Sequence, residues 1–294
     1  MRRAPAPILA LVAVTAIWGY TFVPVQKAVG AYPLFAFLAV RFAISTLALA
    51  PFAWGPLRAL PRAGWAAGIV AGSFLALAYG LQTAGLELTT VTSTGFITGL
   101  YVVFTPLLAL AAFRTPVPAP VWIGVVFALA GLLLLSGAPG GSWTGNLLVL
   151  GNAVAQSFQI VAMERWAPRY DARALTILQM AVAFAGFAVV AVAAGQVEAP
   201  PDAATWYALV VTGVFAGALG YLVSTWVQSR TTAARAALVF TLEAPFAALF
   251  GVLLLSERLG WAGWTGCVVM LAGIVLAEPA AAATLRRLVP ARAG

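Results

Sequence analysis

One carboxylate stands inside a long apolar run near the C-terminal end of the chain. In "TLEAPFAALF" (241–250), Glu243 is the only charged residue of the run 236–256, and Pro245 follows two positions later. A charge inside a membrane-spanning helix costs about 2.5–3.5 kcal/mol on insertion scales, so it is retained where it faces water, protein or a partner. Glu243 could bind a cationic group or carry a proton. It could equally satisfy backbone groups freed by Pro245, or pair with Arg41.

Arg41 is the second charge that is expected well inside an apolar segment. Its long stem could carry the guanidinium to the membrane interface, which favours a structural role. In the alternative interpretation, the guanidinium binds a carboxylate or a phosphate of a ligand.

Uncharged hydrogen-bonding groups also occur among aromatic side chains in several apolar segments. This mixture suits a cavity for an amphipathic solute, although each residue could equally hold helices together or face lipid. The candidates for substrate binding or coupling are Trp18, Tyr20, Phe22, Arg41, Tyr79, Gln82, Thr98, Tyr101, Gln156, Gln159, Trp226 and Glu243. Helix breaks are expected at Pro24, Pro106 and Pro245, and paired breaks in two halves of a chain point to a transport site.

The composition places these residues in a membrane protein. Of the 294 residues, 63% are hydrophobic and 8% are charged, whereas soluble globular chains carry roughly 25% charge. The chain has no histidine, and its eight acidic residues are scattered singly. We therefore predict no metal centre, no cofactor and no catalytic constellation. A Walker-type phosphate loop is also missing from the sequence, which argues against an intrinsic ATPase motor.

Ten apolar segments are long enough to span a bilayer as helices, which takes about 20 residues each. They lie at 8–27, 33–54, 63–84, 88–112, 119–136, 146–163, 174–195, 203–227, 236–255 and 259–277. With the N-terminus in the cytoplasm, thirteen of the sixteen basic residues fall on the cytoplasmic side. This asymmetry follows the positive-inside rule and predicts that both termini are cytoplasmic. The net charge of +8 is thereby explained by topology, and nucleic acid is not an expected partner.

The two halves of the chain resemble each other. "TTVTSTGFITGL" (89–100) aligns with "TTAARAALVFTL" (231–242) at an offset of 142 residues. "WIGVVFALAG" (122–131) aligns with "WTGCVVMLAG" (264–273) at the same offset. These pairs predict an internal duplication.

Other parts of the duplication are less regular. Pro106 aligns with Pro245 at an offset of 139, which requires three extra residues in the first half and places the two prolines at equivalent positions. A weaker match at 138 aligns Arg41 with Gln179. We expect one five-helix repeat at 1–138 and a second at 139–294. Because five is an odd number, the second copy enters the membrane upside down, a recurring design of secondary transporters.

At this point the sequence resembles the drug/metabolite transporter superfamily, in its EamA-type branch. The likeness lies in "WGYTF" (18–22), "TTVTSTGFITGLYVVFTPLLA" (89–109), "LEAPFAALFGVLLLSERL" (242–259) and the paired Trp-x-Gly blocks. The resemblance implies an all-α integral membrane protein with ten transmembrane helices, built as two inverted five-helix repeats around a central cavity. The fifth and tenth helices are expected at the periphery. Members of the family typically move amino acids, other metabolites or amphipathic drugs, commonly outward.

The leading hypothesis is a secondary-active exporter of small metabolites, such as amino acids or amphipathic compounds, that works by alternating access. The alternative is a multidrug or organic-cation efflux carrier coupled to protons. A membrane-embedded enzyme or a structural membrane subunit is a remote alternative. The expected partners are a small-molecule substrate and the lipid bilayer, and small residues on the fifth and tenth segments allow packing within a protomer or in a homodimer. The codon bias suggested by the Ala, Gly, Pro and Arg content favours a bacterial inner membrane.

Overall fold

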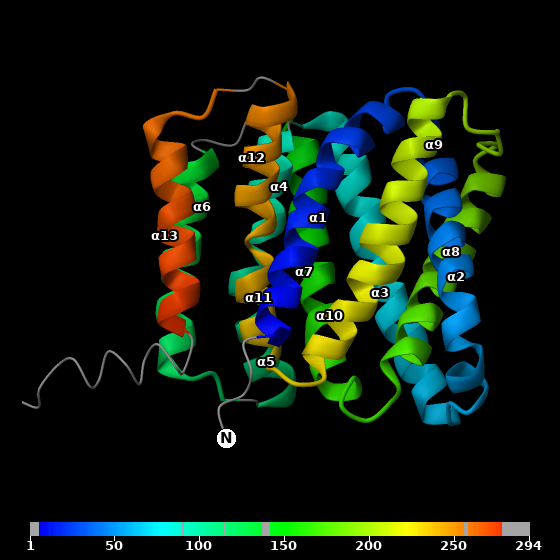
Figure 1. Cartoon of the computed structure of the whole chain (residues 1–294), viewed down its shortest axis with the longest axis horizontal. Coiled ribbons are helices and arrows are strands. Elements are labelled where there is room, and N and C mark those ends of the chain that lie inside the picture. The colour runs from blue at the N-terminus through cyan, green and yellow to red at the C-terminus, as the bar shows by residue number, and fades with distance from the viewer. Residues whose placement is uncertain (1–5, 90, 115, 137–141, 256–257, 278–294) are drawn as a thin grey trace, which may run out of the picture.

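The chain folds as a bundle of helices (Figure 1). The computed structural model describes residues 6–89, 91–114, 116–136, 142–255 and 258–277, and these residues form helices and no strand. The elements are α1 (Ala6–Val29), α2 (Leu34–Arg58), α3 (Arg62–Leu88), α4 (Val91–Gly99), α5 (Tyr101–Phe113), α6 (Ala119–Ser136), α7 (Trp143–Trp166), α8 (Ala172–Ala193), α9 (Ala203–Val210), η1 (Val211–Gly220), α10 (Tyr221–Gln228), α11 (Ala233–Phe240), α12 (Glu243–Leu255) and α13 (Trp261–Ala277).

Eight helical segments in the described part are long and apolar enough to cross a membrane. Three of these segments consist of consecutive elements, namely α4 with α5, α9 with η1 and α10, and α11 with α12. The apolar helices α6 and α13 are shorter than the other eight. Each of the ten segments expected from the sequence therefore overlaps a helix, and eight of them reach full spanning length.

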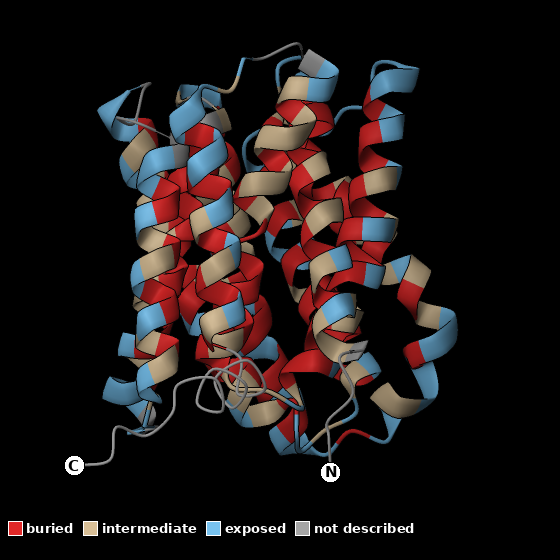
Figure 2. Ribbon diagram, turned by 60° about the vertical axis from the view of Figure 1, so that its left-hand side comes forward, coloured by how far each residue is buried: buried red, intermediate tan, exposed pale blue. Residues whose placement is uncertain are grey.

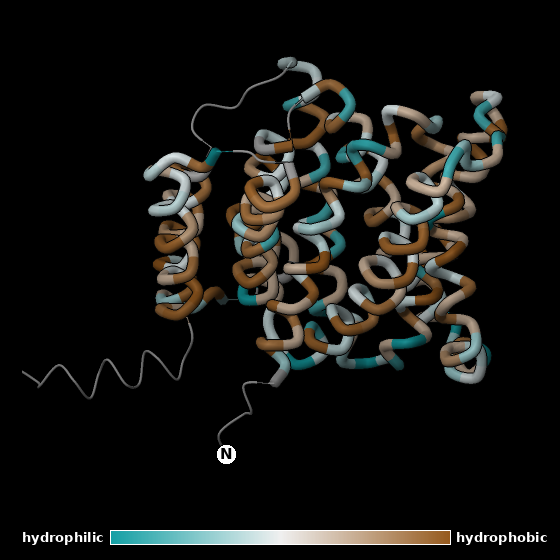
Figure 3. The backbone as a smooth tube through the Cα atoms, turned by 45° about the horizontal axis from the view of Figure 1, so that its top comes forward, coloured by the Kyte–Doolittle hydropathy of each residue, from teal (hydrophilic) through white to brown (hydrophobic). Residues whose placement is uncertain are grey.

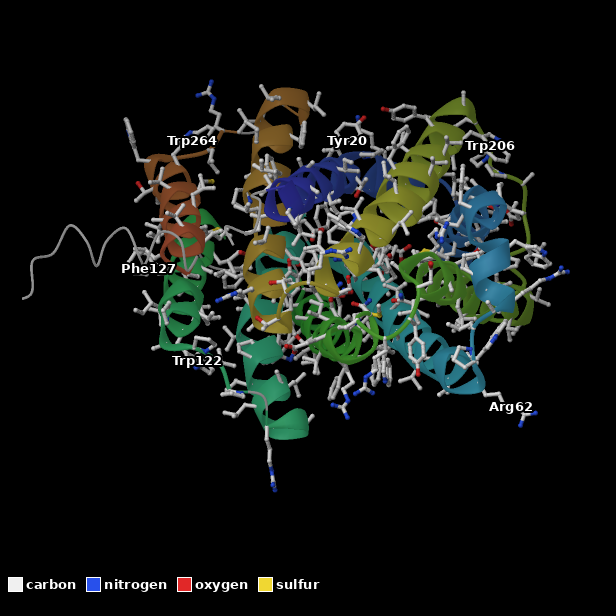
Figure 4. The ribbon with its side chains drawn as sticks, turned by 60° about the horizontal axis from the view of Figure 1, so that its bottom comes forward. Tyr20, Arg62, Trp122, Phe127, Trp206 and Trp264 are labelled. Carbon is white, nitrogen blue, oxygen red and sulfur yellow. The ribbon has the colours of Figure 1, made fainter. Side chains whose placement is uncertain are left out.

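The outer surface of the bundle is apolar. Buried residues face the interior and exposed residues face outward (Figure 2), and hydrophobic residues recur along the outer pair α6 and α13 (Figure 3). On this pair, Val268 and Val275 are 64% and 58% exposed. Trp122, Phe127 and Trp264 also belong to this pair (Figure 4). Such a surface is what a bilayer requires, because hydrocarbon is the solvent on that side.

Helices α6 and α13 run antiparallel and lie at one edge of the bundle (Figure 1). A Cβ atom on Gly124 would lie 2.9 Å from the carbonyl oxygen of Gly273, and one on Gly131 would lie 2.6 Å from the carbonyl oxygen of Gly266. The earlier glycine of α6 thus meets the later glycine of α13. Only glycine permits backbones to approach so closely. These small-residue faces are therefore used for packing within one chain.

The same glycines show how the two halves are related. Gly124 corresponds to Gly266 and Gly131 to Gly273 at the offset of 142. Gly124 therefore contacts the counterpart of Gly131, and Gly131 contacts the counterpart of Gly124. This is the pattern of two helices that cross antiparallel on a two-fold axis. We call two residues repeat mates when they occupy equivalent positions in the two halves. Their residue numbers differ by 138 where α1 and α2 correspond to α7 and α8, and by 142 from α3 onward.

Two spans are broken at matching places. The first break lies at Leu100, between α4 and α5, and the second lies at Thr241 and Leu242, between α11 and α12. Helices α5 and α12 have 13 residues each, and both of their bounds keep the offset of 142. The expected three-residue insertion in the first half is therefore wrong. The two halves align through their helix breaks, at the same offset of 142 as the flanking segments.

The prolines do not mark the breaks in the expected way. Pro245 is the third residue of α12, where a backbone N–H needs no helical partner, so it fits directly after a break. Pro106 is the sixth residue of α5 and lies inside a continuous helix. Pro106 and Pro245 are thus not at equivalent places. Helix α1 likewise continues through Pro24 to Val29, since neighbouring helices can hold a transmembrane helix that has lost one hydrogen bond.

A ten-residue π-helix, η1, interrupts the span of α9 and α10. Two carbonyl oxygens of this π-helix accept hydrogen bonds from neighbouring helices. The indole Nε1 of Trp18 donates to the carbonyl oxygen of Ala216 at 3.0 Å, and the Ser45 hydroxyl donates to that of Gly213 at 2.8 Å. The π-helix thereby fixes α1 and α2 on either side of it.

Candidate functional site

A narrow cavity of about 30 Å³ lies where the broken spans meet, and we call it the main cavity. Its lining comes from both halves of the chain and consists of Trp18, Tyr79, Gln82, Thr98, Tyr101, Asn152, Gln156, Tyr221, Phe240 and Glu243. A buried water needs about 10–15 Å³ of such space, so the main cavity has room for about two waters in this conformation. A bound metabolite would require the surrounding helices to move apart.

Most of the lining is arranged in pairs across the two halves. Eight of the ten lining residues are four pairs of repeat mates, which are Trp18 with Gln156, Tyr79 with Tyr221, Thr98 with Phe240, and Tyr101 with Glu243. The main cavity therefore lies on the axis that relates the repeats. The positions are symmetric while the chemistry is not, because a carboxylate on one side faces a phenol on the other.

A second cavity of about 20 Å³ adjoins the first, and we call it the Arg41 cavity. Both cavities are lined by Trp18, Tyr79, Gln82 and Glu243. The remaining lining of the Arg41 cavity comes from the first half of the chain and consists of Thr21, Phe22, Val25, Arg41, Thr83 and Leu86. This second cavity thus extends the site to one side of the repeat axis.

Glu243 is placed by a helix break and a helix crossing. It is the first residue of α12, so its carboxylate lies at the positive end of a half-helix dipole. Helix α1 crosses α12 at Gly19, where a Cβ atom would lie 2.6 Å from the Cβ of Phe246 and 2.8 Å from the carbonyl oxygen of Glu243. The close crossing brings the neighbouring Trp18 to the same cavity as Glu243. A half-buried acid beside a broken helix is thereby held against the other half of the molecule.

Arg41 is 4% exposed and borders the Arg41 cavity. Its guanidinium carbon lies 4.6 Å from the centre of the Tyr79 ring, within the range of a cation–π interaction. Its Nε atom is buried and has no hydrogen-bond partner in the described part of the chain. Arg41 and Glu243 form no ion pair in the described structure, because no guanidinium nitrogen lies within 4.0 Å of a carboxyl oxygen. The guanidinium and the carboxyl group therefore face the same space without forming an ion pair.

Hydrogen bonds hold the uncharged side chains of the main cavity in place. The Thr98 hydroxyl accepts from Gln82 Nε2 at 3.2 Å and from Asn152 Nδ2 at 2.9 Å. The Tyr221 hydroxyl donates to that of Tyr79 at 3.3 Å. The Trp18 ring lies 5.2 Å from that of Tyr221. Together these contacts connect the side chains of a wall that is part aromatic and part amide.

The structure brings together most of the candidate residues and leaves three elsewhere. The residues at one or both cavities are Trp18, Phe22, Arg41, Tyr79, Gln82, Thr98, Tyr101, Gln156 and Glu243. The Tyr20 hydroxyl instead lies 2.6 Å from that of Tyr207, and Gln159 Nε2 donates to Gln179 Oε1 at 2.8 Å. Trp226 is 37% exposed and packs under Arg230.

Sequence reasoning missed three residues of the main cavity, Asn152, Tyr221 and Phe240. Asn152 precedes Gln156 by four positions on α7, so both lie on one helical face, and that spacing could have revealed it. Tyr221 is the repeat mate of Tyr79, and the duplication could have revealed it. Phe240 is likewise the repeat mate of the candidate Thr98, but its own side chain gives no signal, since an apolar residue in an apolar span is unremarkable.

Comparison with known proteins agrees with a helical membrane carrier built from two repeats. The sequence matches the EamA-like transporter family over residues 5–137 and again over 143–277, and the chain belongs to this family. It is 30% identical over 273 residues to an uncharacterized transporter of Archaeoglobus fulgidus, covering 91% of this chain and 84% of the relative. The protein is accordingly a membrane transporter and not an enzyme.

The fold also matches a solved structure. One crystal structure of a protein superimposes with a TM-score of 0.78 over 97% of this chain and 99% of that chain. The two sequences are 20% identical, so this likeness concerns the fold alone.

Proposed function

We propose that this transporter exports small amphipathic metabolites, with amino acids as the leading class, by alternating access. In this proposal ten helices span the membrane as two inverted units, residues 1–138 and 139–294, around the main cavity. The antiparallel contact of α6 with α13 and the paired lining of the main cavity support the inversion. The match of the family to each half of the chain supports the two units.

The observation that carries the substrate class is that Arg41 and Glu243 border one cavity and form no ion pair with each other. A zwitterion such as an amino acid presents a carboxylate and an ammonium group on neighbouring atoms. Arg41 is suited to the carboxylate, because a guanidinium binds that group through two parallel hydrogen bonds. Glu243 is suited to the ammonium group, and the Trp18 and Tyr221 rings offer cation–π contact beside it.

Alternating access is supported by the repeat mates of the Arg41 cavity. These mates include Gln159, Gln179, Ser224, Thr225 and Gln228, and each of them is at most 3% exposed. Ser224 Oγ and Gln228 Oε1 are buried without a hydrogen-bond partner among the described residues. Buried polar atoms without partners are costly, so a state in which water reaches them relieves that cost. We name these five residues the mirror set. In the opposite-facing state, the mirror set opens and the Arg41 cavity closes.

A second candidate function follows from Glu243 alone. A proton-coupled efflux carrier for organic cations would use this carboxylate in turn for the proton and for the cation. The aromatic lining by Trp18, Tyr221 and Phe240 also suits a cation without a carboxylate. In that case Arg41 is a structural residue that is held by Tyr79.

For the cellular setting, we propose a bacterial inner membrane with both termini in the cytoplasm. The first residue of α1 and the last residue of α13 lie at the same end of the bundle (Figure 1). An even number of spans produces that arrangement. The excess of arginine in the connections at this end, such as Arg58, Arg62 and Arg173, agrees with the positive-inside rule.

The test is efflux from proteoliposomes that contain the purified chain and are loaded with amino acids or with the corresponding decarboxylated amines. Arg41→Gln is expected to lower amino acid flux tenfold or more and to spare amine flux, since a hydrogen bond to a charged group contributes about 1.5–3 kcal/mol. Glu243→Gln is expected to lower both. The control is Tyr20→Phe, which removes a hydroxyl that contacts Tyr207 outside the two cavities. This variant is expected to keep both fluxes.

Two results would decide against this assignment. If Arg41→Gln transports amino acids as the unmodified chain does, the substrate carboxylate does not bind there and the organic-cation candidate replaces it. If the unmodified chain moves neither class of compound in either direction, the proposed substrate class is wrong.

A further inference from the structure

A groove much larger than either cavity lies at the ends of three helices. It has a volume of about 490 Å³, and we call it the α8–α10 groove. Its lining consists of Ala167, Tyr170, Asp171, Ala172, Arg173, Leu222, Val223, Trp226, Ser229 and Arg230. Helix α7 ends at Trp166, α8 begins at Ala172 and α10 ends at Gln228. The groove thus lies at the level where the spans leave the membrane.

The polar end of the groove is cationic. Arg173 forms an ion pair with Asp171, with 2.9 Å between Nη2 and Oδ2. Arg230 has no carboxylate within ion-pair distance in the described part of the chain, and its Nη1 donates to the Trp226 carbonyl oxygen at 2.8 Å and to Ser229 Oγ at 2.7 Å. Since Asp171 offsets one of the two arginines, the groove keeps one net positive charge. The bonds of Arg230 fix its guanidinium at the mouth.

The other end of the groove is apolar. Leu222 and Val223 lie one turn before Trp226 on α10, toward the middle of the span, and all three line the groove. The Arg230 guanidinium carbon lies 4.4 Å from the centre of the Trp226 ring. From Arg230 inward, the surface therefore changes from a cation, through an indole, to aliphatic side chains over about two helical turns.

The opposite end of the molecule has no copy of these charges. The repeat mates of Arg173 and Arg230 are Phe35 and Leu88, and the mate of Asp171 is Pro33. The scaffold that forms the groove is duplicated, whereas its cationic mouth is not. A ligand that recognises this mouth is therefore recognised at one membrane surface only.

We infer that the α8–α10 groove binds an anionic phospholipid. Its phosphate accepts hydrogen bonds from Arg230, and one acyl chain lies along Leu222, Val223 and Trp226. The graded polarity of the groove matches a headgroup above a hydrocarbon chain. Basic pockets between transmembrane helices on the cytoplasmic side are known to suit anionic headgroups. This site is separate from the main cavity and does not depend on which metabolite is transported.

The test compares phosphatidylglycerol with phosphatidylcholine of the same acyl chains, added to the full chain in detergent, with bound lipid counted by native mass spectrometry. The unmodified chain is expected to retain phosphatidylglycerol preferentially. Arg230→Gln is expected to lower phosphatidylglycerol binding about fivefold and to leave phosphatidylcholine binding unchanged, as one basic residue near an anionic headgroup contributes about that factor.

Arg58→Gln is the matched control. Arg58 also lies over a tryptophan, 4.8 Å from the centre of the Trp54 ring, but does not line the groove. It is expected to keep the preference for phosphatidylglycerol. Equal losses in Arg58→Gln and Arg230→Gln would mean a general attraction of arginines to anionic lipid, and an unchanged preference in Arg230→Gln would mean that the lipid binds elsewhere. Either result overturns the inference. Thermal unfolding of both variants in detergent alone checks that they fold.

Discussion

The hydroxyl of Tyr221 donates a hydrogen bond to the hydroxyl of Tyr79 at 3.3 Å, and the two residues are 142 positions apart. That separation equals the offset of the repeat, so two copies of one ancestral position touch each other at the centre of the molecule. Equivalent residues can meet only where the axis relating the halves passes between them. The main cavity surrounds this contact, which explains why most of its lining comes in mates.

The first prediction concerns this tyrosine pair. Tyr79→Phe and Tyr221→Phe are each expected to lower the free energy of unfolding by about 1–2 kcal/mol, because each removes the partner of a hydroxyl in a partly buried hydrogen bond. The double variant is expected to cost less than the sum of the two, since both changes remove one bond. Thermal unfolding in detergent measures all three. Strictly additive losses would show that the two hydroxyls are not coupled.

The second prediction concerns the crossing of α1 and α12. Gly19→Ala would place a Cβ atom 2.6 Å from the Phe246 Cβ and 2.7 Å from the Ala247 nitrogen, so the helices must separate. The expected loss of stability is about 1–3 kcal/mol, typical of overpacking. Gly186→Ala is the control, because nothing lies within 4 Å of a Cβ atom there and alanine favours helix. A melting temperature of Gly19→Ala at or above that of Gly186→Ala would contradict the crossing.

The sequence was sufficient to predict the helices and their duplication, and eight of the ten predicted spans reach full spanning length in the described part of the chain. Long apolar segments must be helical in lipid, and a repeat that includes "TTVTSTGFITGL" is visible without any structure. The places of the helix breaks were not predictable from prolines. Pro24 and Pro106 lie inside continuous helices, and the break at Leu100 carries no proline at all. Tertiary packing decides whether a proline interrupts a transmembrane helix.

The candidate site was only partly predictable, for a geometric reason. Sequence shows that a polar residue lies within a span, and it does not show the direction in which that residue points around the helix. In an amphipathic helix the apolar stripe supplies that direction, whereas spans that are apolar on every side supply none. Tyr20 and Trp18 are two positions apart on α1, and they therefore point to different neighbours, Tyr207 and Ala216.

The third prediction concerns the start of α8. Asp171 is the N-cap of this helix and accepts hydrogen bonds from the backbone and side chain of Arg173. The hydrogen bond from the Arg173 side chain is the main reason that the pKa of this carboxyl is lower than usual. Because the folded pKa is depressed, the ion pair stabilises fully above the unfolded value of about 3.9 and is lost as the pH falls through the folded pKa.

Asp171→Asn tests this cap. Asparagine is an equally good cap residue, so the change is expected to remove the pH dependence of this contact and little else. The gap in melting temperature between Asp171→Asn and the unmodified chain is expected to be small at pH 7, because the pair is partly exposed, and to shrink as the pH falls through the lowered folded pKa of Asp171. Asp171→Ala is expected to cost about 1 kcal/mol at either pH. A gap that grows toward low pH would have the wrong sign for this explanation.

The last prediction tests whether the mirror set opens. Cys267 is the only cysteine in the chain, so Cys267→Ala provides a background for single-cysteine variants. Ser224→Cys and Gln228→Cys are expected to react slowly with a charged thiol reagent in the conformation described above, since both positions are buried. Their reaction is expected to accelerate tenfold or more when transported substrate drives the exchange of states. Access is expected from the side that carries the α8–α10 groove, because Gln228 ends α10 beside it.

Ser45→Cys is the control, as its hydroxyl is buried and bonded to Gly213, away from the mirror set. Equal rates at positions 45, 224 and 228 under turnover would mean that these residues never line an open pathway, and alternating access through them would be excluded.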